Sequence, residues 1–352
     1  MSAFFASIGL PQIVAAVMLV ALNAYVLTGG ADFGGGVWDL LASGSRRDAQ
    51  RTLVSHAIGP IWEANHVWLI VVIVVLFTAF PPVFATLGTV LHIPLSLMLV
   101  GIVLRGSAFV FRSYGARDDA TQRRWGRVFA IASVITPLLL GVIVGAIVSG
   151  RVGRAAALLP ANGGASTADF STVYMASWLA AFPLMLGVMT LALFAFLAAV
   201  YLTVAAADAA LREDFRRRAL VAGVAALAAS FGALALAHRE APWLSWALTE
   251  TPIAALLQLV VALVALLALA ALWTRRWRLA RLAAALQVSL ILWGWVPLQY
   301  PWMLPPLYTT HEAAAPRITL ELLLWGLAGG SAILIPSLIY LFRTFAKSAA
   351  VR

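Results

Sequence analysis

The sequence predicts an all-α integral membrane protein with about nine transmembrane helices. Of its 352 residues, 63% are hydrophobic and only 11% are charged, and the mean hydropathy is +0.96. A water-soluble domain cannot hide that much apolar surface, because its outer shell must face water. A spanning helix needs about 20 apolar residues, so the chain has room for about eight to ten spans and only short loops.

Nine apolar runs follow one another along the chain. They cover residues 11–27, 52–80, 83–111, 128–149, 173–205, 219–237, 252–273, 282–298 and 320–342. Pro81 and Pro82 predict a tight turn between the second and third runs, since neither proline can continue a helix. Pro60 leaves two alternatives for the second run: the spanning helix starts there, or the helix kinks.

The basic residues predict the orientation, because cytoplasmic loops carry an excess of Lys and Arg. With nine spans and an outside N-terminus, 19 of the 24 basic residues fall on the cytoplasmic side. Those 19 follow the first, third, fifth, seventh and ninth runs: Arg46, Arg47, Arg51; Arg112, Arg117, Arg123, Arg124, Arg127; Arg212, Arg216, Arg217, Arg218; Arg275, Arg276, Arg278, Arg281; Arg343, Lys347, Arg352. The C-terminus is therefore expected in the cytoplasm.

Composition also excludes several classes of function. The net charge of +10 is spread in short clusters between apolar runs, which argues against a nucleic-acid partner. There is no cysteine, so neither disulfides nor thiolate-held metal centres are available. The first basic residue is Arg46, and a secretory leader begins with positive charge, so the first run is expected to be a retained helix.

The second run holds the richest set of polar groups: His56, Trp62, Glu63, Asn65 and His66. On a continuous helix His56 and Glu63 share a face, and His66 lies one turn beyond Glu63. An ionisable group inside a membrane is costly and is a functional candidate by default. Apolar surroundings favour the neutral carboxyl, which suits Glu63 to a proton relay. The alternative is that Glu63 and His66 satisfy one another, or pair with Arg105, purely as structure.

Asp32 lies in a glycine-rich segment expected at the cytoplasmic end of the first helix, where glycines permit close backbone approach and unusual torsions. The spacing does not fit a nucleotide-binding loop, since no strand precedes it and no Lys-Ser/Thr follows. Asp32 is either a proton-entry carboxyl or a cap for the following helix. The segment reads Gly29-Gly30-Ala31-Asp32-Phe33-Gly34-Gly35-Gly36.

The third run carries His92 in its outer half and Arg105 near its inner edge, where Arg105 is expected to extend its charge toward the membrane surface. His66 and His92 raise the hypothesis of direct haem ligation. It is disfavoured because the chain has five histidines, two of which, His238 and His311, fall in predicted outside loops. His311 and Glu312 form a polar pair in the last outside loop, with no function indicated.

Three segments resemble subunit II of cytochrome bd-type quinol oxidases, and the resemblance covers essentially the whole chain. Tyr300-Pro301 and the segment 313–316 resemble the cyanide-insensitive branch more weakly. The three segments are Gly30-Ala31-Asp32-Phe33-Gly34-Gly35-Gly36, Ile58-Gly59-Pro60-Ile61-Trp62-Glu63-Ala64-Asn65-His66-Val67-Trp68-Leu69-Ile70 and Phe77-Thr78-Ala79-Phe80-Pro81.

The resemblance implies two four-helix bundles plus one peripheral helix, in the inner membrane of a bacterium. It implies a heterodimer with a larger subunit I, which carries two b-type haems, haem d and the quinol site, so that no haem is bound by this chain. The complex oxidises quinol and reduces dioxygen to water. A small single-helix accessory subunit and a structural quinone or lipid are further expected associates.

By the same resemblance this chain serves assembly, stability and part of a proton-uptake route. The family's Trp-(Asp/Glu)-x-Asn acid falls on Glu63, and its Gly-x-Asp acid falls on Asp32. Gly29 replaces a further Asp of many members, which removes one carboxyl from the route. His56 and His66 join the predicted proton pathway, while Asn65, Arg105, His92 and Trp62 are expected to give polar support. The alternatives are a polytopic secondary transporter and a purely structural scaffold.

Overall fold

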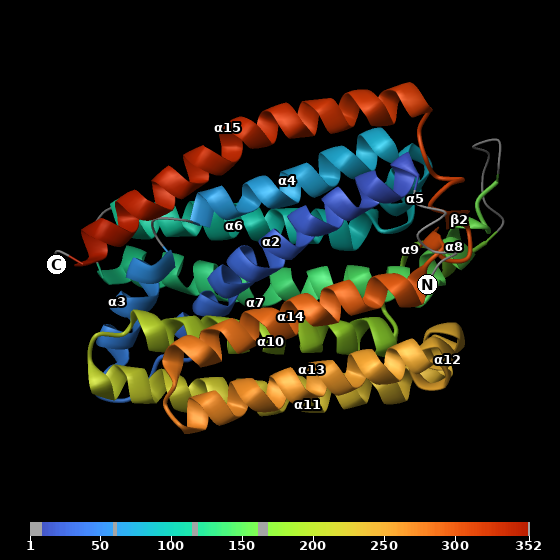
Figure 1. Ribbon diagram of the computed structural model, residues 1–352. Helices are drawn as coiled ribbons and strands as arrows, with labels where there is room; N and C mark the ends of the chain where they lie inside the picture. Colours follow the sequence, from blue (N-terminus) through green and yellow to red (C-terminus); the bar gives the residue numbers. More distant parts are fainter. Residues whose placement is uncertain (1–8, 59–61, 115–118, 161–167, 351–352) are drawn as a thin grey trace.

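The computed structural model is an elongated bundle of long, roughly parallel and antiparallel helices (Figure 1) and describes residues 9–58, 62–114, 119–160 and 168–350. Among these residues eight helices are long and apolar enough to cross a membrane, and the bent pair α4–α5 brings the number to nine. Those nine are α2 (Leu10–Leu40), α4 (Trp62–Ala79), α6 (His92–Tyr114), α7 (Asp119–Val148), α10 (Ala181–Ala205), α11 (Ala209–Glu240), α13 (Pro252–Trp273), α14 (Trp277–Gln299) and α15 (Arg317–Ala350).

Shorter elements connect the spans at the two ends of the bundle. They are α3 (Arg47–Ile58), α5 (Pro81–Val90), α8 (Arg151–Ala156), α9 (Phe170–Tyr174), α12 (Pro242–Glu250) and the antiparallel pair β1 (Trp302–Leu304) and β2 (Tyr308–Thr309). Several have local start signals. Asp169 accepts a hydrogen bond from the Ser171 amide before α9, and Pro242 lies in the first turn of α12, where a missing N–H costs nothing.

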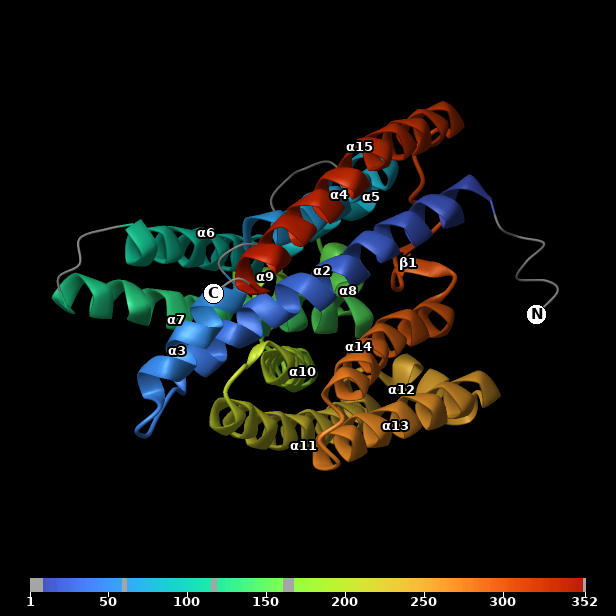
Figure 2. The same ribbon diagram turned by 60° about the vertical axis from the view of Figure 1, so that its left-hand side comes forward.

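The expected grouping into two four-helix bundles and one peripheral helix is confirmed. Helices α2, α4, α6 and α7 form one group, and α10, α11, α13 and α14 form the other. Helix α10 lies between the groups, packed against α2 and α7 on one side and α11 and α14 on the other (Figure 2). Its segment 193–200 is buried on every face, as expected for a helix that is apolar all round. Helix α15 lies at the edge of the bundle against α2 and α4.

The two groups repeat one order of elements, which the sequence did not reveal. In each group a short helix that begins with proline joins the second span to the third: α5 in the first group and α12 in the second. Both short helices lie at the end of the bundle where α2 begins (Figure 1), whereas α15 ends at the opposite end. The start of α2 and the end of α15 therefore lie on opposite sides of the bundle, as an odd number of spans requires.

Some predicted boundaries differ from the structure. The first helix does not stop near Leu27 but continues to Leu40, because its glycines pack against neighbouring helices where no water competes for the backbone. The expected run 52–80 covers the end of α3 and all of α4, and Pro60, on which the two alternatives for this run depend, lies outside the described residues. The run 173–205 is divided into α9 and α10.

The predicted tight turn at Pro81 and Pro82 is also wrong. Both prolines occupy the first turn of α5, which bends away from α4 by 114°. Proline is tolerated there because the first amides of a helix have no partner within the helix. The predicted run 83–111 is consequently two helices, and the spanning part begins only at His92.

Candidate functional site

The glycine-rich half of α2 is the closest-packed part of the site. A Cβ on Gly34 would lie 2.0 Å from the Phe194 carbonyl oxygen of α10, and one on Gly36 would lie 2.1 Å from the Ser133 Oγ of α7. Trp38 Nε1 donates to the Ala195 carbonyl at 2.8 Å and pins the same interface. The close approach predicted for the glycines is therefore present, but the segment is regular helix. Asp32 is thereby held in the middle of the first bundle.

Asp32 forms a buried ion pair with Arg105 of α6. Arg105 Nη1 donates to one carboxylate oxygen at 2.8 Å and Nη2 donates to the other at 2.6 Å, and each side chain is 2% exposed. Arg105 also donates through Nη2 to the Asp32 carbonyl and through Nε to Ser133 Oγ, at 3.1 and 3.0 Å. Its guanidinium lies 4.8 Å from the ring centroid of Phe33 and 4.9 Å from that of Phe129. The sequence predicted that Arg105 extends toward the membrane surface, and this is wrong. Its guanidinium stays buried because it pairs with the carboxylate of Asp32.

A second ion pair lies seven residues further along both helices. Arg112 donates to both carboxylate oxygens of Asp39 at 3.0 and 3.1 Å, and Arg51 Nε approaches Asp39 to 3.9 Å. We call the two pairs the α2–α6 ion-pair ladder: Asp32–Arg105 and Asp39–Arg112. Because both rungs join residues 73 positions apart, α2 and α6 run in the same direction there. A single span, α4, therefore returns the chain between them.

Helix α4 is bonded to α2 through Asn65, which is 1% exposed and donates through Nδ2 to the Thr28 carbonyl at 3.4 Å. His66, the next residue, faces the aromatic side chains of α2. Its ring centroid lies 6.1 Å from that of Tyr25 and 6.2 Å from that of Phe33. His66 also lines a groove of about 420 Å³ whose other walls come from α6, including Gly106 and Ser107. The polar segment of α4 thus borders both the ladder and the groove.

Glu63 points away from the ladder. Its side chain is exposed and has no hydrogen bond or ion pair with any residue that the structure describes. Neither pairing of Glu63 that the sequence left open, with His66 or with Arg105, is present among the described contacts; Arg105 is occupied by Asp32. Three exposed apolar side chains lie on the same face of α4 as Glu63, seven, eleven and fourteen residues later: Ile70, Val74 and Phe77.

His56 and Trp62 lie at the facing ends of α3 and α4. His56 is exposed near the end of α3, whereas Glu63 belongs to α4, and residues 59–61 between the two helices lie outside the described part of the chain. Trp62 is the first residue of α4, and its side chain lies outside the described part of the chain.

His66 and His92 lie at different levels of the bundle, too far apart to ligate one haem together. His92 begins α6, at the end of the bundle where α4 finishes, whereas His66 lies in the second turn of α4. At 1.5 Å per residue, the 13 residues from His66 to Ala79 separate the two levels by about 20 Å. His92 instead contacts the Thr89 carbonyl through Nδ1 at 2.9 Å and the ring of Tyr174 at 5.2 Å. No group of three or more metal-binding side chains occurs among the described residues.

The outside polar pair is ordered by local contacts. His311 Nε2 lies 2.6 Å from Gln12 Nε2, which ties the last loop to the start of α2. Glu312 accepts hydrogen bonds from the Thr309 amide and hydroxyl at 2.9 and 2.7 Å, and these bonds lower the pKa of the Glu312 carboxyl. The pair therefore shapes the loop around β2.

Three members of the site were missed from the sequence: Asp39, Arg112 and Ser133. The signal for the first two was present, because the spacing from Asp32 to Asp39 equals that from Arg105 to Arg112, and equal spacings of seven on two helices predict matching rungs. No sequence signal marks Ser133, whose role depends on how α7 packs against Gly36.

Comparison with known proteins identifies the family over nearly the whole chain. The sequence profile of the family described as cytochrome bd terminal oxidase subunit II matches residues 10–345. The structure of bd oxidase from Geobacillus thermodenitrificans contains a similar chain: the TM-score is 0.77, the identity is 20%, and the match covers 96% of this chain and 98% of that one.

Two curated relatives match over a shorter segment. The cytochrome bd ubiquinol oxidase subunit 2 of Bacillus subtilis (strain 168) is 35% identical over 115 residues, 32% of this chain and 33% of the relative. The cytochrome bd-I ubiquinol oxidase subunit 2 of Escherichia coli (strain K12) is 30% identical over 131 residues, 37% of this chain and 34% of the relative. The aligned part of the chain thus spans about a third of the length of each relative.

Proposed function

Because this chain belongs to the family of subunit II of cytochrome bd terminal oxidases, we propose that it is the haem-free subunit of a bacterial membrane quinol oxidase. In that complex a larger subunit I carries two b-type haems and haem d. Two quinols give up four electrons and four protons in total, and one dioxygen takes up four electrons and four protons to form two waters. This chain contributes the fold that stabilises subunit I and a route for protons entering from the cytoplasm.

The observation that carries the proposal is the exposure of Glu63 on a membrane-spanning helix. A carboxyl that faces hydrocarbon is costly, and intramembrane acids normally face protein or water. The apolar stripe that continues from Glu63 along α4 has the character of a surface that packs against another hydrophobic chain. We therefore assign the exposed face of α4 to the contact with subunit I, with Glu63 at the end of that contact.

In this arrangement Glu63 exchanges protons and the ladder does not. Both carboxylate oxygens of Asp32 accept hydrogen bonds from Arg105, so Asp32 holds a fixed charge in place instead of passing a proton on. His66, one turn from Glu63 on α4, supplies a second titratable group beside the groove. The exposed His56 on α3 is the entry group on the cytoplasmic side, and the N-terminus lies outside the cell membrane.

The decisive experiment replaces Glu63 with Gln and measures quinol-driven oxygen uptake by the purified complex, normalised to its haem content. Losing a general acid–base group predicts a fall of about 100-fold or more. The matched control is Glu250→Gln, since Glu250 is an exposed acid on α12 whose described contact is with its neighbour Thr249. Undiminished turnover in Glu63→Gln leaves only the stabilising role, and a colourless chain that purifies without a haem-bearing partner contradicts the whole assignment.

A further inference from the structure

A second cluster of charged groups lies away from the ladder, where α2 ends and α11 begins. The loop 43–46, Gln50 of α3 and the first turns of α11 enclose a cleft of about 300 Å³. We call it the Arg46–Arg218 cleft. Its lining residues are Ser43, Gly44, Ser45, Arg46, Gln50, Asp214, Arg217 and Arg218. Three of these eight residues are arginines and one is acidic.

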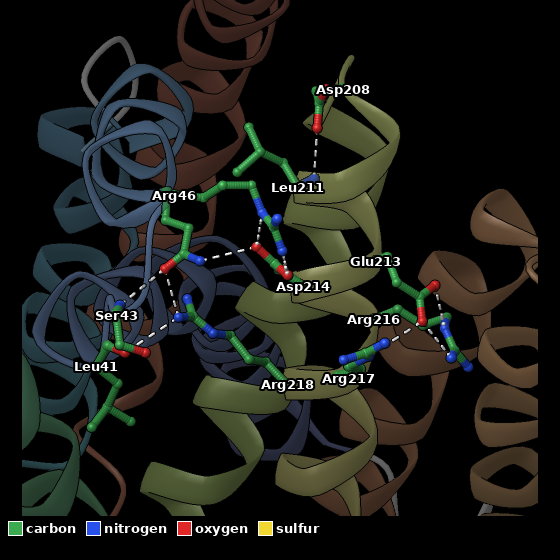
Figure 3. Close-up of polar contacts among 11 residues, drawn as sticks. Leu41, Ser43, Arg46, Asp208, Leu211, Glu213, Asp214, Arg216, Arg217 and Arg218 are labelled. Carbon is green, nitrogen blue, oxygen red and sulfur yellow. Dashed lines mark hydrogen bonds and ion pairs between the residues drawn. The ribbon is translucent and has the colours of Figure 1, made fainter.

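The one acid of the cleft is already neutralised. Arg46 donates to both carboxylate oxygens of Asp214 at 2.8 and 2.6 Å, and Gln50 donates to one of them at 3.0 Å. Figure 3 shows Arg46 reaching across from the loop after α2 to Asp214 on α11. The Asp214 carboxylate raises the pKa of the Arg46 guanidinium through this pair. The positive charge of Arg218 therefore has no acid of its own in the cleft.

Arg218 is held in place but not fully satisfied. Its Nη2 donates to Gln50 Oε1 at 2.7 Å and to the Leu41 carbonyl at 3.2 Å. Its guanidinium lies 5.5 Å from the ring centroid of Trp38 and 5.2 Å from that of Phe215. Nη1 is buried and has no hydrogen-bond partner among the described residues. An unsatisfied buried donor on a charged group is costly, so an acceptor entering the cleft would be stabilised by it.

The surroundings indicate the class of that acceptor. Guanidinium groups match the oxygens of a phosphate through paired hydrogen bonds. The cleft lies at the end of the bundle that carries most basic residues, which is the level of lipid headgroups if those loops are cytoplasmic. Leu40 and Leu41, beside the cleft, are exposed and offer apolar contact to acyl chains. We propose that the Arg46–Arg218 cleft binds a phosphate group, that of an anionic phospholipid headgroup or of free inorganic phosphate.

Two variants of the full chain in its purified complex test the site. Ser45→Asp adds a negative charge to the lining at a residue that makes no hydrogen bond or ion pair with the described part of the chain. Arg46→Gln removes one positive charge from the lining. The control is Arg278→Gln, which removes the same charge from an exposed residue at the start of α14, away from the cleft. Size-exclusion chromatography confirms assembly of each complex.

Native mass spectrometry counts phosphatidylglycerol against phosphatidylcholine retained from mixed micelles, and thermal midpoints are compared in phosphate and chloride at equal ionic strength. We expect binding by the unaltered complex and by Arg278→Gln, with affinity about tenfold weaker in Ser45→Asp and Arg46→Gln. Preference for phosphatidylglycerol identifies a lipid headgroup, whereas stabilisation by phosphate alone identifies the free anion, and either result supports the site. Binding of neither, or equal loss in Arg278→Gln, overturns the proposal.

Discussion

Replacing Asp32 with Asn tests the buried rung of the α2–α6 ion-pair ladder. The change keeps the size of the side chain but removes the charge that faces Arg105. In the unaltered chain both side chains are 2% exposed. Breaking a buried pair by neutralising one partner costs about 3–5 kcal/mol, because the remaining charge is left uncompensated away from water. The contacts to Ser133 and to the rings of Phe33 and Phe129 remain, so the lower half of that range is expected.

The matching double variant separates charge from packing. Asp32→Asn combined with Arg105→Gln removes both charges and leaves two neutral groups that can hydrogen-bond. Since removing both partners of a buried pair is far less costly than removing one, the double variant should recover most of the stability lost in Asp32→Asn. A favourable coupling energy of about 1–3 kcal/mol between the two positions is expected, the size typical of residues in one network.

The assay is unfolding of the detergent-solubilised complex by SDS titration and by heat, followed by tryptophan fluorescence. Arg317→Gln is the control, since Arg317 forms an exposed pair with Glu321 on α15, and water screens the charges of such a pair. Our reasoning is refuted if Asp32→Asn lowers the free energy of unfolding by no more than Arg317→Gln does. It is also refuted if the loss in the double variant equals the sum of the losses in the two single variants.

Three further outcomes follow from the same contacts. Gly34→Ala should destabilise the bundle by about 1–3 kcal/mol, because its methyl group meets the Phe194 backbone, whereas Gly126→Ala, whose Cβ would meet nothing within 4 Å, should not; thermal unfolding of both complexes checks this. Asp39→Asn should cost less than Asp32→Asn, since the Arg112 side chain is 23% exposed and can reach water; the same SDS titration decides the order. The lowered pKa of Glu312 means that its hydrogen bonds stabilise the outside loop above the unfolded carboxyl's pKa and are lost as pH falls through the folded value. Proteolysis of this loop should therefore accelerate in acid for the unaltered chain, and Glu312→Gln should remove that acceleration.

Much of the fold follows from particular features of the chain. The apolar runs identify the spans because lipid accepts only long apolar helices whose backbone groups are satisfied internally. Prolines identify breaks, as at Pro81, but not what the break becomes: the same residue permits a turn or the first turn of another helix. The choice of α5 over a turn depends on a bend of 114° that places it across the end of the bundle.

The candidate site, too, was predicted only in part from the sequence. Glu63, Asn65 and His66 stand out in sequence, because polar groups within an apolar run are rare and costly. Nothing in the sequence says which of them faces inward, and the structure turns Asn65 to Thr28 and exposes Glu63. A rotation of about 100° per residue decides this, and the direction is set by which face of α4 packs on α2.

The sequence by itself determined that the chain lies in a membrane, that it crosses it an odd number of times and that α4 carries titratable groups, because hydropathy and charge asymmetry are properties of composition along the chain. Only the tertiary structure decided the partners of those charges. Arg105 was expected to reach for the surface, yet it bonds to Asp32 across two helices, because the glycines of α2 bring α7 and α10 close enough to bury the pair. Long side chains on neighbouring helices have many candidate partners, and packing distances alone select among them.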